Sequence, residues 1–136
     1  MVKVIPIKFH RFNEENGCLC VFESGQLVPF PIKRVFTVAA GKGDIRGQHA
    51  HKLCAQILVS ISGSIRVKSD NGLEQSISLL EGMGSGLLIP PGIWSSQEYL
   101  CNDSVLMVLC DRGYEVDDYI RDYLEFKTFL STKGSN

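Results

Sequence analysis

Residues 56–80 read QILVSISGSIRVKSDNGLEQSISLL, and this stretch decides the fold class. Apolar residues alternate with other residues in three successive runs, 56–62, 64–69 and 75–80, which is the pattern of β-strands. Turn sequences that contain glycine separate the runs, and the dipeptide Asn71-Gly72 between the second and third runs is a strong hairpin signal. The stretch therefore predicts short, hairpin-connected strands.

The rest of the chain extends this pattern in both directions. Further short strands are expected near residues 18–23, 33–40, 87–90 and 104–110, as in a β-sandwich or small barrel. Only residues 115–130 change character, because apolar residues recur there every three or four positions and predict an amphipathic helix. The sequence predicts one all-β domain with a short C-terminal α-helix over residues 1–131, and a disordered tail at 132–136.

The composition of the 136-residue chain argues against several classes of protein. Fourteen Lys and Arg against fifteen Asp and Glu give a net charge of −1, without the basic excess that binding to a nucleic-acid backbone requires. No apolar run approaches the roughly 18 residues of a membrane helix, and no signal-peptide core is present. The five cysteines are odd in number and lie mostly in strand-like segments, which favours free thiols in a reducing compartment. We expect a cytoplasmic protein that binds neither nucleic acid nor membrane.

The clearest chemical signal is the sequence RGQHAHK at residues 46–52. On a strand, residues two apart point to the same face, so His49 and His51 are expected to project together into one cavity. Because an imidazole titrates near neutral pH, such a pair suits general acid–base chemistry. The alternative is that both side chains merely form hydrogen bonds at the rim of a barrel.

The spacing around these histidines resembles the two signatures of the cupin superfamily. The first signature is matched by Gly43, His49, His51 and Gly63, with Gln56 where the pattern has glutamate. The second is matched by Gly84, Pro90, Pro91 and Gly92, with Ser95 where the pattern has histidine. The resemblance implies a double-stranded β-helix, or jelly roll, whose interior holds the site. Metal-binding cupins use three histidines and a glutamate, but here Gln56 and Ser95 supply a neutral amide and a hydroxyl, which are poor ligands for transition metals. We therefore expect no metal and no cofactor.

Four motifs narrow the resemblance further. They are PFPIKRVF at 29–36, RGQHAHK at 46–52, PPGIWS at 90–95 and YEVDDYIRDYLEF at 114–126. Together they resemble the dTDP-sugar 3,4-ketoisomerases, metal-independent cupins often described as WxcM-like. The resemblance implies a homodimeric isomerase that converts dTDP-4-keto-6-deoxy-D-glucose to a 3-keto isomer, which serves the synthesis of 3-amino sugars for structures such as lipopolysaccharide. The alternatives are an epimerase-like cupin acting on another keto-sugar, a cupin that binds sugar nucleotides without catalysis, and a metal-dependent dioxygenase or isomerase.

The resemblance also implies roles for single residues. His49 is expected to remove a proton from carbon and His51 to move a proton between oxygens, although the reverse assignment stays open. Arg46 is expected to bind the nucleotide phosphates, because a guanidinium is a planar bidentate donor, with a salt bridge at the rim as the alternative. The other residues expected at the substrate are Lys33, Gln56, Trp94 and Ser95.

The sequence leaves two points open. Lys33 and Arg34 point in opposite directions on a predicted strand, and the sequence does not decide which one faces the site. Relatives typically carry histidine where this chain has Ser95 and arginine where it has Asn16. Because relatives differ in product stereochemistry around these positions, the configuration at C4 of the product is left undecided.

Overall fold

The computed structural model describes residues 2–134, and strands dominate it. The first half contains β1 (Ile5–Lys8), β2 (Arg11–Glu14), β3 (Gly17–Cys20), β4 (Glu23–Ser24), β5 (Leu27–Val28), β6 (Arg34–Ala40) and β7 (Ile45–His51). The second half adds β8 (Gln56–Ser62), β9 (Ser64–Asp70), β10 (Gln75–Glu81), β11 (Ser85–Ile89), β12 (Trp94–Tyr99), β13 (Ser104–Cys110) and β14 (Tyr119–Ile120). A 3₁₀ turn, η1 (Val116–Asp118), precedes β14, and the helix α1 (Tyr123–Gly134) follows it.

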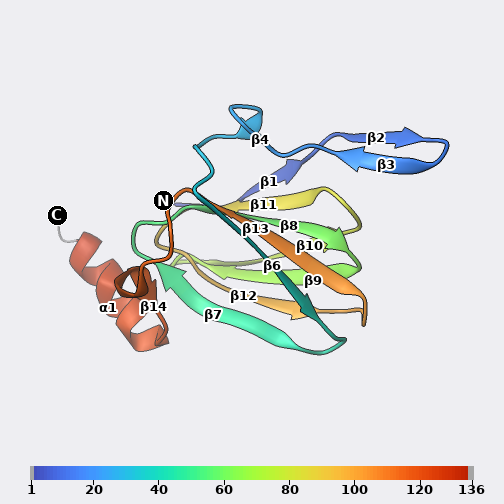
Figure 1. Cartoon of the computed structure of the whole chain (residues 1–136). Coiled ribbons are helices and arrows are strands. Elements are labelled where there is room, and N and C mark those ends of the chain that lie inside the picture. Colours follow the sequence, from blue (N-terminus) through green and yellow to red (C-terminus); the bar gives the residue numbers. More distant parts are fainter. Residues whose placement is uncertain (1, 135–136) are drawn as a thin grey trace.

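Two five-stranded antiparallel sheets form the body of the molecule (Figure 1). Their strand orders are β1-β11-β8-β13-β6 and β10-β9-β12-β7-β14. From β6 onward the chain repeatedly crosses from one sheet to the other, which is the winding of a jelly roll. The hairpin β2-β3 extends away from this body, and α1 lies beside the end of β7 (Figure 1). The predicted all-β jelly roll with a short C-terminal helix is confirmed.

The central strand β8 is buried on both of its faces. Leu58 belongs to the main apolar cluster with Ile65 and Val67 of β9. Ile57 and Val59 point the other way, into a second cluster with residues of the N-terminal segment and β13. Burying an aliphatic side chain of this size stabilises the fold by about 1.5–3 kcal/mol. The N-terminal segment therefore acts as an outer layer over the first sheet.

The same alternation has a different result in β10, which is the edge strand of the second sheet. Ile77 and Leu79 share a face there, as the pattern indicates, but they are 66% and 51% exposed. Leu80 is the member of this strand that enters the main cluster. The hairpin expected between β9 and β10 is present, and Asn71 Oδ1 accepts hydrogen bonds from the two backbone N–H groups at residues 73 and 74, both at 3.0 Å.

The helix predicted over residues 115–130 is wrong in its first part. Residues 116–118 form the 3₁₀ turn, and β14 pairs with β7 through Tyr119 and His51. The α-helix starts only at Tyr123, because Asp122 Oδ1 accepts hydrogen bonds from the N–H groups of residues 124 and 125 and caps the helix. The helix continues to Gly134, so residues 132–134 of the expected tail are helical, and residues 135–136 lie outside the described part.

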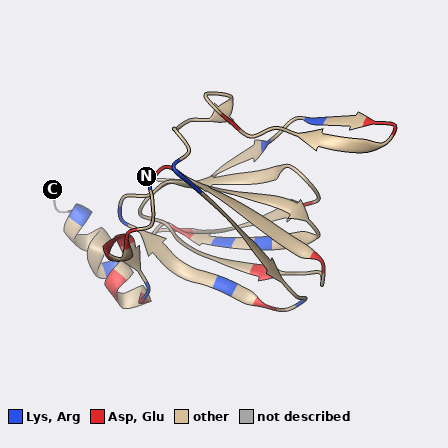
Figure 2. Ribbon diagram, viewed as in Figure 1, with Lys and Arg blue, Asp and Glu red and all other residues tan. Residues whose placement is uncertain are grey.

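Charged residues of both signs are interspersed along the strands and α1 rather than gathered on one element (Figure 2). None of the five cysteines, all of which lie within the described residues, forms a disulfide. Among residues 2–134 there is also no helix with the length and apolar character needed to span a membrane.

Candidate active site

A bulge in β7 aims the two histidines into the jelly roll. Gly47 and Gln48 both adopt left-handed backbone conformations, with φ of 86° and 56°, which is uncommon for a residue other than glycine. The pairing with β12 shifts at this point, so that His49 lies opposite the buried Ser95. Such bulges re-aim side chains next to functional sites. The predicted common orientation of His49 and His51 is present, with ring centroids 5.1 Å apart.

His51 forms a buried dyad with Asp118. The Nδ1–H group of His51 donates to Asp118 Oδ2 at 2.8 Å, and both residues are almost completely buried. Asp118 Oδ1 accepts a second hydrogen bond, of 2.6 Å, from the backbone N–H of Leu53. Because Nδ1 carries the proton, His51 Nε2 is unprotonated and can accept a hydrogen bond or a proton. Nε2 has no hydrogen-bond partner among the described residues.

The environment holds both imidazoles in the neutral form at neutral pH. Burial, with a smaller contribution from the neighbouring His51, lowers the pKa of His49 to about 4. Burial also lowers the pKa of His51, although the hydrogen bond to Asp118 opposes this shift. Burial alone would raise the pKa of Asp118, but the hydrogen bonds from His51 and from backbone N–H groups lower it, so the carboxylate is ionised. The dyad therefore pairs a neutral imidazole with a charged carboxylate.

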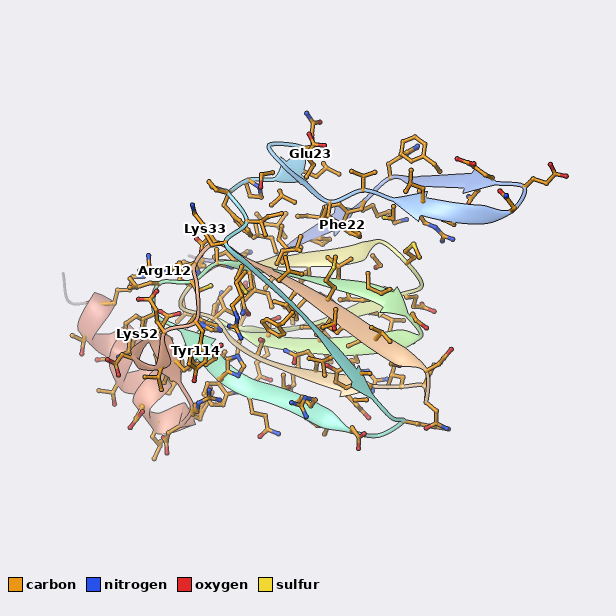
Figure 3. All side chains as sticks on the ribbon, viewed as in Figure 1. Phe22, Glu23, Lys33, Lys52, Arg112 and Tyr114 are labelled. Atoms are coloured by element: carbon orange, nitrogen blue, oxygen red, sulfur yellow. The ribbon has the colours of Figure 1, made fainter. Side chains whose placement is uncertain are left out.

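Tyr119 and Arg34 complete one wall beside the histidines. The Tyr119 ring lies 4.4 Å from the His51 ring and 5.1 Å from the His49 ring, measured between centroids. Arg34 Nη1 donates to the Tyr119 hydroxyl at 3.2 Å. The Arg34 guanidinium also lies 5.2 Å from the ring centroid of Tyr114, which is labelled in Figure 3. A permanent cation is thus held on the hydroxyl of the ring that packs against both imidazoles.

The structure decides between the two neighbouring cations at the start of β6, Lys33 just before the strand and Arg34 as its first residue. Arg34 turns toward the histidines, whereas Lys33 is exposed and points away from the sheets in Figure 3. Trp94 likewise lies outside the interior, because its ring packs against Tyr123 and Phe126 of α1. Lys33 and Trp94, both expected at the substrate, are therefore not brought together with the histidines.

The remaining expected residues are Ser95, Gln56 and Arg46, and the structure places Ser95 beside a histidine. Ser95 is buried and pairs across from His49, and Gln56 is buried on β8. Gln56 Nε2 donates to Cys110 Sγ at 3.5 Å. Arg46 is exposed and lies on the same strand as the histidines, beyond the bulge. The neutral amide and hydroxyl at the third and fourth cupin ligand positions do not fit a transition-metal centre at those positions.

Sequence reasoning missed three members of this wall: Asp118, Tyr119 and Arg121, whose guanidinium lies 4.4 Å from the Tyr119 ring centroid. They lie in the segment that was expected to be the first turns of the helix. The available signal was the motif YEVDDYIRDYLEF itself, since three carboxylates, two aromatic rings and a cation lie within the eight residues 114–121.

Comparisons with known proteins agree with this geometry. The sequence model of the FdtA family, described as "WxcM-like, C-terminal", matches residues 2–131. A TDP-4-oxo-6-deoxy-α-D-glucose-3,4-oxoisomerase from Aneurinibacillus thermoaerophilus is 38% identical over 127 residues, which cover 92% of this chain and 91% of the relative.

Solved structures extend the agreement to the fold. QdtA, a sugar 3,4-ketoisomerase from Thermoanaerobacterium thermosaccharolyticum solved with TDP, superposes with a TM-score of 0.90 at 31% identity, over 96% of each chain. WlaRA, a TDP-fucose-3,4-ketoisomerase from Campylobacter jejuni, gives 0.86 at 29% identity, over 94% of this chain and 96% of its own. The resemblance drawn from the four motifs is confirmed, and the chain belongs to the FdtA, or WxcM-like, family.

Proposed function

We propose that the protein is a sugar-nucleotide 3,4-ketoisomerase that converts dTDP-4-keto-6-deoxy-D-glucose to a dTDP-3-keto-6-deoxyhexose. One observation carries the proposal: two neutral imidazoles lie side by side in the interior, and each presents a buried nitrogen with no hydrogen-bond partner among residues 2–134. These atoms are His49 Nδ1 and His51 Nε2. The name of the 38% identical relative supports the same reaction. A histidine-to-asparagine variant of QdtA, solved with TDP-4-keto-6-deoxyglucose, supports the same substrate class.

The reaction moves a carbonyl from C4 to C3 and needs only proton transfers. His49 takes the proton from C3, the electron pair of the C–H bond forms the C3=C4 double bond, and the C4 oxygen takes a proton to give the enediol. The C3 hydroxyl then loses its proton, the C3 carbonyl forms and C4 is protonated. The sum is an isomerisation, in which no oxidant or reductant is consumed.

The hydrogen bond to Asp118 suits His51 to carry a proton between the C3 and C4 oxygens of the sugar. When Nε2 accepts a proton from one oxygen, the resulting imidazolium keeps its Nδ1–H on the Asp118 carboxylate, 2.8 Å away. The carboxylate therefore stabilises the charged intermediate state of His51, which can pass the proton to the second oxygen. Arg34 and the Tyr119 hydroxyl are placed to stabilise negative charge on the enolate oxygen in this water-poor interior.

Binding of the nucleotide uses the open side of the site. Arg46, exposed on the same strand as the histidines, is proposed to hold the phosphates through its bidentate guanidinium. Ser95, buried opposite His49, and Gln56, buried on β8, are proposed to contact the sugar. The contacts of Trp94 with α1 support a packing role for its ring.

Two wider expectations belong to the same proposal. A homodimer is supported by the β2-β3 hairpin, which extends from the body and carries exposed apolar side chains, including Phe12 at 46% and Leu19 at 55% (Figure 1). A role in the cytoplasm, in the supply of 3-amino sugars, is supported by the five free thiols and by the nature of the proposed product, since a 3-keto group is the acceptor that an aminotransferase needs.

The decisive experiment is incubation with dTDP-4-keto-6-deoxy-D-glucose in deuterated water, followed by NMR of the product. Wild-type protein is expected to give a 3-keto sugar with deuterium at C4, and the spectrum also reports the configuration at C4. His49→Asn is expected to abolish both conversion and exchange, while His10→Asn, the same change at the exposed third histidine, keeps them. If the wild type binds the nucleotide but shows neither exchange nor product, the protein is a binding cupin and the proposal fails for this substrate. Exchange with inversion and no movement of the carbonyl would instead identify an epimerase.

A further inference from the structure

A second cluster of reactive side chains lies on the side of His51 where its Nδ1 faces Asp118. His51, Cys54 and Asp118 each offer one ligand atom, and these atoms lie within 4.8 Å of one another. All three residues are buried, with exposed fractions of 7%, 5% and 6%. The cluster shares His51 with the proposed active site and with the cupin ligand positions, but Cys54 and Asp118 are not cupin ligand positions, which are completed by Gln56 and Ser95.

The chain holds this cluster in place through its backbone. After β7, the N–H of Lys52 donates to the Asp118 carbonyl at 2.9 Å, and the N–H of Leu53 donates to the Asp118 carboxylate at 2.6 Å. These bonds wrap residues 52–54 around Asp118 and bring the thiol of Cys54 to the same side as the carboxylate. The Cys54 thiol donates a hydrogen bond to the carbonyl oxygen of Ala55 at 3.4 Å, which fixes its direction. The three ligand atoms are therefore arranged before any ion arrives.

The set of donors selects one class of cation. A thiolate, an imidazole and a carboxylate together suit zinc and similar borderline-soft divalent ions, which are held by three protein ligands with a fourth position open. Magnesium and calcium prefer oxygen ligands and are disfavoured by the sulfur. In a tetrahedral zinc site with ligand bonds of about 2.0–2.3 Å, the ligand atoms lie closer together than 4.8 Å, so modest side-chain movements bring them into range.

We propose that His51, Cys54 and Asp118 form an inhibitory site for a zinc-class divalent cation. Binding replaces the hydrogen bond between His51 and Asp118: the Cys54 thiol loses its proton to solvent, and the proton on His51 Nδ1 moves to Nε2, so that Nδ1 coordinates the ion. One proton is released for each ion bound. His51 Nε2 then carries a proton and no longer accepts one, so proton exchange between the sugar oxygens stops. The inhibitory effect rests on the proposed function, whereas the binding site does not.

Spectroscopy tests the binding independently of activity. The full-length protein, kept reduced with a phosphine that lacks thiols, is titrated with Co²⁺ as a probe for the zinc-class ion. Wild-type protein is expected to show a thiolate-to-cobalt charge-transfer band that saturates at one ion per chain and disappears when Zn²⁺ is added. Cys54→Ala is expected to lose the band. The double variant Cys18→Ser/Cys20→Ser, which removes the two thiols of the β2-β3 segment, is the matched control and is expected to keep it.

Activity measurements test the inhibition. Zn²⁺ is expected to suppress isomerisation by wild-type protein, and a chelator is expected to restore it. Cys54→Ala should be active without metal and should need a Zn²⁺ concentration on the order of tenfold or more higher for the same inhibition, because loss of even an outer-shell partner weakens metal binding 10–100-fold. The site is overturned if Cys54→Ala keeps the cobalt band or equals wild type in zinc sensitivity. If no variant isomerises the substrate, the proposed function fails while the cobalt titration still decides whether the site exists.

Discussion

Replacing Asp118 with asparagine changes the charge of the dyad while preserving its shape. In the structure the carboxylate accepts the His51 Nδ1–H at 2.8 Å in a buried position, and it also accepts the backbone N–H of Leu53 at 2.6 Å. The asparagine oxygen can still accept from Leu53, so the loop after β7 should keep its path. The amide no longer carries the negative charge that stabilises the His51 imidazolium.

The size of the effect follows from that lost charge. A hydrogen bond to a charged group contributes about 1.5–3 kcal/mol, and because the imidazolium forms only during the reaction, the loss falls on the transition state. At 1.36 kcal/mol for each factor of ten, kcat should fall by roughly 10- to 150-fold, with little change in KM. The assay is the rate of isomerisation of dTDP-4-keto-6-deoxy-D-glucose followed by proton NMR at several substrate concentrations.

The neighbouring Asp117 provides the control, because it is exposed in the same 3₁₀ turn. Asp117→Asn should retain the wild-type kcat, and unfolding by urea should show that both variants are folded under the assay conditions. The reasoning is refuted if Asp118→Asn keeps kcat within twofold of wild type. It is equally refuted if the loss appears only in KM, because the carboxylate would then act on substrate binding and not on the charged state of His51.

Two further predictions concern stability. Gly63→Ala should lower the free energy of unfolding by roughly 2–4 kcal/mol, because φ is +77° there and a Cβ atom would lie 2.6–2.7 Å from side-chain and backbone atoms of Ser104. Gly82→Ala has φ of +68° but open space around the added Cβ atom. It should therefore cost only the strain of the left-handed backbone, about 1–2 kcal/mol, and urea unfolding measures both values. Asp70 should make the fold acid-sensitive. Burial alone would raise its pKa, but the hydrogen bonds from the Tyr123 hydroxyl (2.6 Å) and from a backbone N–H lower the pKa. The contribution of Asp70 to stability is therefore present above the ordinary carboxyl pKa of about 4 and is lost as the pH falls below that value. Urea unfolding at a series of pH values should show a smaller acid loss in Tyr123→Phe than in wild type, and an unchanged loss would contradict this account.

The period-two pattern of the sequence predicted β8, β9 and β10 and the shared direction of the two histidines, whereas β1, β2 and β12 were not expected from it. It could not say which face of a strand is inside, because the alternation is the same for both faces. Ile77 and Leu79 show this limit: they alternate as regularly as Ile65 and Val67, yet they lie exposed on an edge strand while the other pair is buried. Inside and outside are settled only when the second sheet is placed.

Residues 115–122 show a different limit. Their apolar spacing fits a helix, and α1 does form just beyond them. A pairing with β7 and two hydrogen bonds to Asp118 override this local preference in the preceding residues. These partners lie more than sixty positions earlier in the chain, so no local window of sequence contains the information. The same reason explains why Asp118 and Tyr119 were missing from the expected site.

The separation of the dyad along the chain has a consequence for biosynthesis. His51 and Asp118 are 67 residues apart, so at a translation rate of about 5–20 residues per second Asp118 leaves the ribosome roughly 3–13 s after its partner. During that interval the strand that carries His51 can exist, but its edge is uncovered and the imidazole has no carboxylate to fix its proton. Catalytic competence is therefore among the last properties that a nascent chain acquires. A polypeptide that ends before η1 would contain both histidines but not Asp118, and so would lack the dyad that proton exchange requires.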